Sequence, residues 1–311
     1  MLLITASIGA VKRLPIIVAL AITGVGACAN ESTTDDGTVT VAVAFYPIEE
    51  IVRRVGGNNI EVATLVPPGD EPHEFEPTAR QVADLENADV VFFLGNGFQP
   101  NLEKAIDALP DSVRRVDLLQ AGMLDGLSLI LVGDDGGVDP HVWLDPRQMQ
   151  SMADAVAAVL GEISPELSDT YFDSSSEFGR ELDALDDEFK RGLADCDVPV
   201  LITTHEAFAY LASAYGLTQL AIAGISPGDE PSAQALEEIA EAAKQNGVTT
   251  VFFEENLPPD LARTVADEIG AATSSLATAE TLTQSQLDAG ESYLSIMRDN
   301  LQALRAGLGC A

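Results

Sequence analysis

The sequence contains few basic residues, few aromatic residues and very few histidines or cysteines. Its 311 residues include 16 lysines and arginines against 50 aspartates and glutamates, which gives a formal net charge of −34. Such a chain repels nucleic acid and anionic lipid, and its field attracts cations, so we exclude nucleic acid as a partner. Net charge alone does not define a metal site, because acidic faces of proteins are usually only solvated.

No apolar run reaches the length of a membrane-spanning helix, which needs roughly 20 residues. The run Leu14–Val25 spans only about a dozen residues and follows the basic pair Lys12 and Arg13. A basic pair followed by a short apolar run is typical of a signal sequence. We therefore expect residues 1–27 to be a signal peptide.

The predicted signal peptide ends at Val25-Gly26-Ala27-Cys28, which resembles a bacterial lipobox. This resemblance implies that the mature chain begins at a lipid-modified Cys28, anchored to the extracytoplasmic face of the cell membrane. The alternative is ordinary secretion with an incidental cysteine. Residues 28–37 are mostly acidic, small or polar, and we expect them to form a flexible acylated tether.

Only two other cysteines are present, Cys196 and Cys310. Because disulfides persist in the compartments that exported proteins occupy, we predict a Cys196–Cys310 bridge that fastens the last residues to the segment before Val198. Two free thiols or two soft metal ligands are the alternatives, since the sequence does not show whether the two Cα atoms approach closely enough.

Short apolar runs alternate with helical patterns along the rest of the chain, which has enough residues for two domains. This alternation predicts an α/β fold with parallel sheets and helices on both faces. Expected strands are 38–44, 61–66, 89–94, 113–118, 198–203, 220–222 and 248–253; expected helices are 47–55, 78–86, 102–109, 146–160, 232–246, 258–269 and 287–308.

A long helical pattern separates two βα halves that resemble each other in organisation. Apolar residues between positions 165 and 193 recur at spacings of three, four or seven, which favours one continuous helix over two helices broken near 173–176. We therefore expect an N-terminal lobe over residues 38–160, a connecting helix over residues 165–193 and a C-terminal lobe over residues 194–311.

The three histidines are His73, His141 and His205, and each lies in a turn-rich segment or at a strand end. In open α/β sheets ligands bind beyond the carboxyl ends of the strands, which is where these positions fall. Three converging imidazoles suit zinc, because neutral imidazole is the commonest protein ligand for transition metals. A lone histidine is more often a surface or core group, but the agreement of three contexts favours a shared metal site.

Three segments around these histidines resemble the metal-ligand motifs of the solute-binding lipoproteins of zinc and manganese ABC transporters. The segments are residues 67–78, 139–146 and 203–211. The resemblance covers essentially the whole mature chain in order, and implies two pseudo-symmetric α/β lobes joined by one rigid helix with the metal in the cleft. It implies that His73 and His141 of the first lobe and His205 of the second bind the metal.

The resemblance breaks down at the fourth ligand. In that family it is often an aspartate of a late strand-to-loop segment, but here the matching position falls on Ala277 or Thr278. We therefore expect water as the fourth ligand, with Glu280 and Glu254 as alternatives. Manganese-type members tend to have glutamate at the third position, where this chain has His205. Three histidines without a carboxylate favour zinc over manganese, which prefers oxygen ligands.

Four carboxylates beside the histidines are candidates for orienting the imidazoles, or are simply solvated. They are Glu71, Glu74, Asp139 and Glu206.

The resemblance implies a monomeric extracytoplasmic receptor that captures Zn²⁺ and delivers it to an ABC permease powered by a cytoplasmic ATPase. A zinc hydrolase is the main alternative, because three histidines and an open position also describe catalytic zinc. The pair His205-Glu206 nevertheless lacks the second histidine of a helical zinc-protease motif, since position 209 is alanine. A manganese receptor and a surface adhesin are the remaining alternatives.

Overall fold

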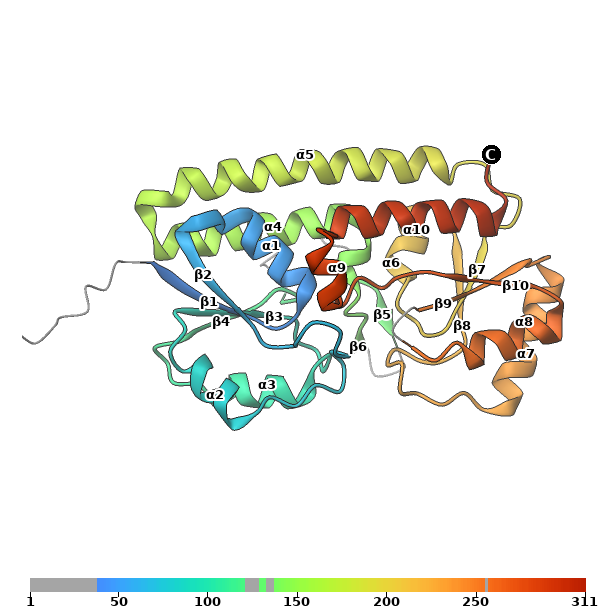
Figure 1. Cartoon of the computed structure of the whole chain (residues 1–311), viewed down its shortest axis with the longest axis horizontal. Helices are drawn as coiled ribbons and strands as arrows, with labels where there is room; N and C mark the ends of the chain where they lie inside the picture. The colour runs from blue at the N-terminus through green and yellow to red at the C-terminus, as the bar shows by residue number, and fades with distance from the viewer. Residues whose placement is uncertain (1–37, 121–128, 133–136, 255–256) are drawn as a thin grey trace, which may run out of the picture. The chain divides into compact units, whose positions relative to one another are not determined.

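Two four-stranded parallel sheets frame the structure, a computed structural model that describes residues 38–120, 129–132, 137–254 and 257–311. The first sheet has the order β2-β1-β3-β4, and the second has the order β8-β7-β9-β10. Each half thus places its strands in the same sequence order, so the predicted α/β fold with two similar lobes is confirmed (Figure 1). The strands are β1 (Val39–Val43), β2 (Ile60–Thr64), β3 (Val90–Phe93), β4 (Arg114–Asp117), β7 (Val200–Thr203), β8 (Thr218–Ala221), β9 (Thr250–Phe253) and β10 (Ala272–Ser275).

The predicted signal peptide, the tether over residues 28–37 and Cys28 lie outside the described residues. Within the described part of the chain, no helix is both long and apolar enough to cross a membrane.

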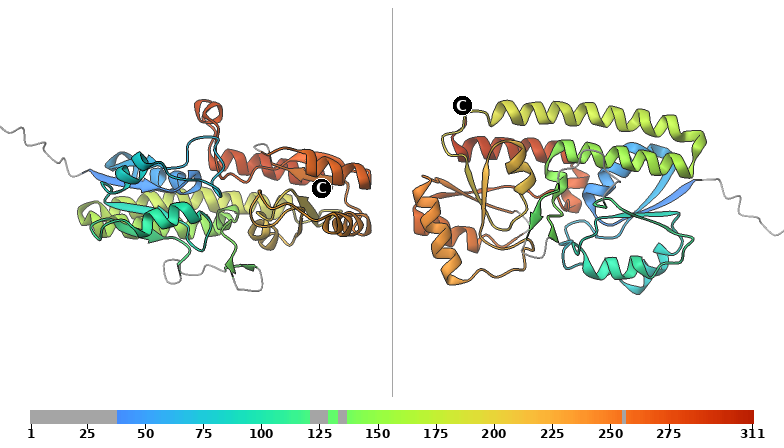
Figure 2. Two further views of the ribbon diagram at one scale, coloured as in Figure 1. Left: turned by 90° about the horizontal axis from the view of Figure 1, so that it is seen from below. Right: turned by 180° about the vertical axis from the view of Figure 1, so that it is seen from behind.

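The central strands of the first sheet are almost entirely apolar because helices cover both faces of that sheet. β1 reads VTVAV and β3 reads VVFF, and Val41, Val43 and Phe92 are fully buried. Such runs are typical of parallel strands covered on both sides. Figures 1 and 2 show α1 (Tyr46–Gly56) opposite α2 (Ala79–Leu85) and α3 (Pro100–Asp107) around the first sheet, and α10 (Tyr293–Leu308) opposite α7 (Ala233–Gln245) and α8 (Asp260–Ile269) around the second.

Two helices, α4 (Pro146–Ile163) and α5 (Ser168–Gly192), pack side by side, and α5 runs along one edge of the molecule past both halves (Figure 1). α5 runs for 25 residues without a break, which confirms the predicted single helix and makes it about 38 Å long at 1.5 Å per residue. It contacts α1 and α4 beside the first sheet and α10 beside the second. Its buried residues are Tyr171, Ser175, Phe178, Gly179, Leu182, Leu185, Asp186 and Phe189.

The predicted final helix over residues 287–308 is wrong at its start. The structure has two helices there, α9 (Gln284–Asp288) and α10, which begins at Tyr293. The chain turns between them at Gly290, whose φ of 79° suits glycine. Ser292 then caps α10 by accepting a hydrogen bond from the backbone N–H of Ser295. The turn at Gly290 and the cap at Ser292 therefore separate two helices.

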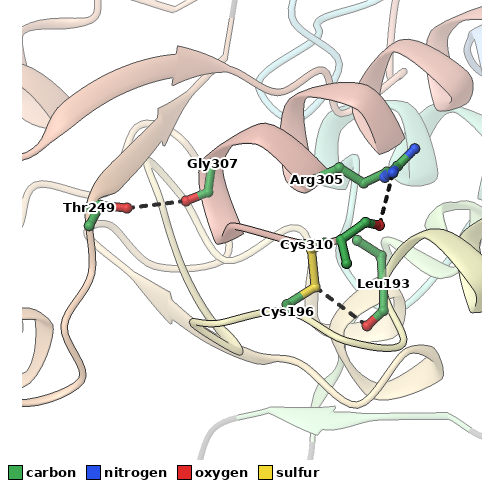
Figure 3. Close-up of a disulfide and its surroundings, with 7 residues drawn as sticks. Leu193, Cys196, Thr249, Arg305, Gly307 and Cys310 are labelled. Atoms are coloured by element: carbon green, nitrogen blue, oxygen red, sulfur yellow. Dashed lines mark hydrogen bonds between the residues drawn. A yellow bond between two sulfur atoms is a disulfide. The ribbon is translucent and has the colours of Figure 1, made fainter.

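A disulfide joins Cys196 to Cys310 across 114 residues of sequence (Figure 3). Cys196 follows α5 and Cys310 follows α10. The end of the connecting helix and the end of the chain are therefore covalently tied beside the second sheet.

One large hydrophobic core contains side chains from both halves. Val91 of β3, Phe178 of α5, Phe252 of β9 and Leu304 of α10 belong to the same cluster. A smaller second cluster lies between the second sheet and α8 and includes Val251 and Val265. Because the large core is shared, a wide opening of one half from the other would expose apolar surface, which costs about 25 cal/mol per Å².

Candidate metal centre

Four buried side chains bring one donor atom each into a single cluster, which we call the four-donor cluster: His73, His141, His205 and Glu280. The four donor atoms lie within 4.8 Å of one another. His141 and His205 are fully buried, and His73 and Glu280 are only 6% and 5% exposed. The structure therefore unites the three histidines singled out from the sequence, and adds a carboxylate.

His73 lies in the loop that follows β2. The carboxylate of Glu71 accepts hydrogen bonds from the backbone N–H groups of His73 (2.9 Å) and Glu74 (3.0 Å), and so folds the loop into a turn. The ring of His73 packs edge-on against Phe98, with ring centroids 4.6 Å apart. The side-chain amide of Gln99 donates to the Pro72 carbonyl at 3.1 Å and so fixes the loop immediately before His73.

His141 lies just before a single 3₁₀ turn, Val142–Leu144, that leads into α4. One carboxylate oxygen of Asp139 accepts a hydrogen bond from the His141 backbone N–H at 2.9 Å and lies 2.8 Å from the ring Nδ1. Both side chains are fully buried. With Nδ1 committed to Asp139, the ring presents Nε2 to the cluster.

His205 follows β7 and precedes α6 (Ala209–Ala214). Its Nδ1 lies 2.7 Å from a carboxylate oxygen of Glu254, which stands at the end of β9. The hydroxyl of Thr204 donates to the same oxygen. Glu254 therefore orients the His205 ring, and Nε2 again faces the other donors.

Glu280 comes from the loop after β10. Its Oε1 lies 3.3 Å from Nε2 of His141, 3.6 Å from Nε2 of His73 and 3.8 Å from Nε2 of His205. The residue before it, Ala279, has a φ of 55°, a left-handed backbone that is uncommon outside glycine. The turn at Ala279 carries the chain from β10 to the cluster.

The donor atoms form a tetrahedron of the size that a zinc ion needs. Bonds of about 2.0–2.1 Å from a central ion place the corners of a regular tetrahedron about 3.3–3.4 Å apart. The Nε2 atoms of His141 and His73 are 3.3 Å apart, and those of His205 and His141 are 3.4 Å apart. Together with the distances to Glu280, five of the six edges lie between 3.3 and 3.8 Å.

The charges of the cluster are strongly coupled. Burial by itself lowers the pKa of His141, but hydrogen bonds and charge interactions with Asp139 and Glu280 outweigh it and raise that pKa to about 9. Burial raises the pKa of Glu280, but the surrounding imidazoles, with His141 first, outweigh it and hold that pKa well below its ordinary value. The cluster therefore combines an anionic carboxylate with a protonated imidazole when it holds no cation.

The cluster lies between two cavities. One is lined by His73 together with Glu74, Glu206 and Asp229, and is bordered by the hairpin β5 (Leu131–Val132) and β6 (Gly137–Val138). The other is lined by Glu280 and Glu254 and by residues next to α9. In the left view of Figure 2, the hairpin projects on one side of the molecule, opposite the orange-red turn that carries α9. Both approaches to the cluster are acidic.

Around the three histidines, the structure differs from the expected fourth ligand and gives the expected orienting carboxylates different contacts. Water was the expected fourth partner, whereas the structure has Glu280 Oε1 at the fourth corner. Glu254, the other alternative, contacts His205 Nδ1 instead. Of the four carboxylates expected to orient imidazoles, only Asp139 contacts a ring, and Glu71 binds backbone N–H groups. Glu74 and Glu206 line the cavity beside His73 and the β5–β6 hairpin.

The pKa of Glu206 is also shifted by burial and by a nearby carboxylate. Its partial burial, and next the negative charge of Asp139, raise the pKa of this side chain above the ordinary value for glutamate.

Comparison with known proteins identifies relatives over almost the whole chain. The model of the family described as zinc-uptake complex component A, periplasmic, matches residues 41–307. The high-affinity zinc uptake system protein ZnuA of Bacillus subtilis is 32% identical over an alignment that covers 91% of this chain and 93% of that protein. The zinc-binding lipoprotein AdcA of Streptococcus pneumoniae is 34% identical, covering 90% of this chain but only 57% of AdcA.

A solved structure supports the same relationship. The crystal structure of the Zn(II)-bound ZnuA-like domain of Streptococcus pneumoniae AdcA matches with a TM-score of 0.74 and 33% identity, over 87% of this chain and 99% of that domain. This chain thus spans a little over half the length of AdcA, and nearly all of its ZnuA-like domain. Since the family match, the relatives and the fold all agree, the chain belongs to the ZnuA family of zinc-uptake complex component A proteins.

Proposed function

We propose that this protein is an extracytoplasmic zinc receptor that captures Zn²⁺ at the four-donor cluster and delivers it to an ABC-type metal importer. The observation that carries the proposal is the arrangement of three Nε2 atoms and one carboxylate oxygen, in which five of the six distances are 3.3–3.8 Å and suit tetrahedral zinc. The ligands are His73, His141, His205 and Glu280. Zinc is the cargo of this site, so binding must be reversible.

The donor set favours zinc over manganese. Three imidazoles and one carboxylate suit a borderline ion, whereas Mn²⁺ is better served by carboxylate, carbonyl and water oxygens. The carboxylates of Asp139 and Glu254 hold the Nδ1 sides of two rings at 2.8 and 2.7 Å. Such carboxylate–histidine contacts fix the ring tautomer and increase ligand basicity, which further supports zinc binding at Nε2.

Transport is a better explanation of the cluster than hydrolysis. A catalytic zinc site usually keeps one coordination position open for water or substrate, whereas structural and storage sites use four protein ligands. Here Glu280 Oε1 fills the fourth corner, and all four side chains are at least nine-tenths buried. We therefore infer that the protein is not an enzyme.

We further propose a lipid anchor, a monomeric state, transport partners and lobe boundaries for this receptor. Lipid modification at Cys28 anchors the mature chain to the extracytoplasmic face of the cell membrane, and the protein acts as a monomer that meets an ABC permease and its ATPase. Residues 38–160 and 194–311 are the two lobes, and residues 165–193 form the connecting helix. The length and packing of α5 support this division, because one helix contacts elements of both halves.

Metal competition tests the proposal directly. Purified protein is exposed to equal concentrations of zinc and manganese and the bound metal is analysed; we expect one zinc per chain and almost no manganese. Preferential retention of manganese, or no retained metal, would contradict the proposal.

Ligand variants test the assignment of the site. We expect His141→Ala and Glu280→Gln to lower zinc affinity sharply in a chelator competition titration. Glu74→Gln is the matched control, because it removes a carboxylate charge from the adjoining cavity outside the cluster, and its affinity should stay close to that of the unaltered protein. Unchanged affinity in Glu280→Gln would restore water as the fourth ligand.

A further inference from the structure

Trp143 is the only tryptophan of the chain, and it lies fully buried between two segments that carry cluster donors. We propose that Trp143 is a positioning residue that sets the Glu280 carboxylate against His141, and thereby determines the affinity and coordination geometry of the metal site. The inference rests on the proposed function, because it requires that the cluster bind a metal ion.

Aromatic side chains of the first half pack against the indole ring, and a hydroxyl of α10 holds the backbone of Trp143. His141 lies two residues before Trp143, in the same short segment that ends with the 3₁₀ turn. The ring packs against Phe45 (5.1 Å between centroids), Phe98 (5.8 Å) and His141 itself (5.3 Å). The hydroxyl of Tyr293, in α10, donates to the Trp143 carbonyl at 2.6 Å. The position of the indole is therefore fixed relative to His141.

The indole N–H reaches across to the loop that carries Glu280. Trp143 Nε1 donates to the carbonyl of Thr278 at 2.8 Å, in a buried contact between residues 135 positions apart. The neighbouring Ala277 is held at both polar backbone groups by the side chain of Asn300, at 2.8 and 2.7 Å. Glu280 comes two residues after Thr278, so these contacts define where its backbone starts.

The carboxylate of Glu280 depends on this backbone support. Its Oε1 is buried and has no hydrogen-bond donor of good geometry among the described residues. Oε1 is therefore held in place by the backbone of Glu280 and by the imidazoles that it faces, of which His141 is the nearest at 3.3 Å. Trp143 therefore connects a ligand of the first half to the ligand from the loop after β10 through one hydrogen bond.

Loss of the indole N–H would loosen one ligand while leaving the others in place. Phenylalanine retains an aromatic ring at position 143 but leaves the Thr278 carbonyl buried without its donor, which is unfavourable. The loop then shifts toward solvent, and Glu280 no longer lies at the corner of the tetrahedron. Removal of a supporting partner of a metal ligand typically lowers affinity about 10- to 100-fold.

Cobalt(II) binding to Trp143→Phe tests this role with a signal that a merely structural residue would not change. The visible spectrum of bound cobalt changes with the identity and the number of its ligands, so it reports whether Glu280 remains one of them. We expect Trp143→Phe to bind zinc about 10- to 100-fold more weakly and to give a cobalt spectrum close to that of Glu280→Gln. Tyr215→Phe is the control, because it removes a tyrosine hydroxyl that donates a hydrogen bond to Asp186 outside the cluster. Its cobalt spectrum should match that of the unaltered protein.

The double variant Trp143→Phe with Glu280→Gln separates positioning from general destabilisation. If Trp143 acts through Glu280, the double variant binds zinc no more weakly than Glu280→Gln alone. Additive losses, or an unaltered cobalt spectrum in Trp143→Phe, would overturn the inference and leave the proposed function intact. Failure of the unaltered protein to bind zinc or cobalt would instead overturn the proposed function.

A measurement on the unaltered protein covers the case in which Trp143→Phe does not fold. Since the chain has one tryptophan, its ¹⁵N-labelled form gives one indole N–H resonance in NMR spectra. We expect that proton to resist exchange with solvent in both the metal-free and the zinc-bound protein, because the contact with Thr278 exists before the metal arrives. Rapid exchange in the metal-free form would overturn the inference.

Discussion

Zinc binding should release a proton from His141, and the pH dependence of affinity should reveal it. The contacts with Asp139 and Glu280 raise the pKa of this imidazole to about 9 in the metal-free cluster, so nearly every molecule carries a proton there at pH 7. A metal ligand must be unprotonated at its donor atom. Zinc therefore displaces the Nε2 proton, while Nδ1–H stays bonded to Asp139.

The size of the effect follows from this single proton. Below a pKa of about 9, each unit of pH changes the unprotonated fraction of His141 about tenfold, which corresponds to about 1.4 kcal/mol in the free-energy cost of deprotonation. We expect zinc affinity to rise about tenfold per pH unit between pH 7 and 8.5, and the rise from this group to level off above pH 9. Glu280 adds no proton in this range, because its pKa is held below the ordinary value.

Chelator competition at several pH values measures the slope, and calorimetry in buffers of different ionisation enthalpy counts the released proton. Asp139→Asn is the informative variant, because it removes a carboxylate that raises the His141 pKa. It should move the onset of levelling to lower pH. Affinity that does not change between pH 7 and 8.5 in the unaltered protein would refute the reasoning about His141.

Four further predictions concern the supporting structure. Glu254→Gln should lower zinc affinity about 10- to 100-fold in a competition titration, because its carboxylate lies 2.7 Å from His205 Nδ1; an unaltered affinity would contradict its orienting role. Replacing Cys196 and Cys310 together by serine should lower the free energy of unfolding by about 2–5 kcal/mol in urea denaturation, with zinc affinity nearly unchanged. Phe178→Ala, at a side chain that is 1% exposed in α5, should cost about 3–5 kcal/mol by the same measurement. X-ray scattering of the metal-free and zinc-bound protein should differ little, since α5 and the shared core connect both halves; a large compaction on binding would contradict this.

The alternation of apolar strands and amphipathic helices was sufficient to predict the fold class, because both signals are local. The largely buried β1 and β3 read as mostly apolar runs, and the stripe from Tyr171 to Phe189 has helical spacing. The break between α9 and α10 escaped the same reasoning. Its signal, Gly290 followed by the cap Ser292, was present in the sequence, but the prediction placed one helix across both residues.

The three histidines could be found from the sequence because each stands in a segment of recognisable local character. Glu280 could not be assigned in the same way, because the matching aspartate is missing and the sequence left water, Glu280 and Glu254 as alternatives. Its place at the fourth corner depends on the left-handed turn at Ala279 and on contacts from Trp143 and Asn300. Those partners are 135 residues before Thr278 and 23 residues after Ala277.

The sequence by itself determined the acidic character of the chain, its parallel α/β halves, its long connecting helix and three imidazoles at strand or loop ends, because these properties depend on composition and on short-range spacing. Only the tertiary structure decided which carboxylate meets the imidazoles and which one orients them. Glu254 and Glu280 are the same residue type, and both are buried. One lies against Nδ1 of His205 and the other against three Nε2 atoms. The reason is that Glu254 directly follows β9, whereas Glu280 stands farther beyond the end of β10, after the left-handed turn at Ala279.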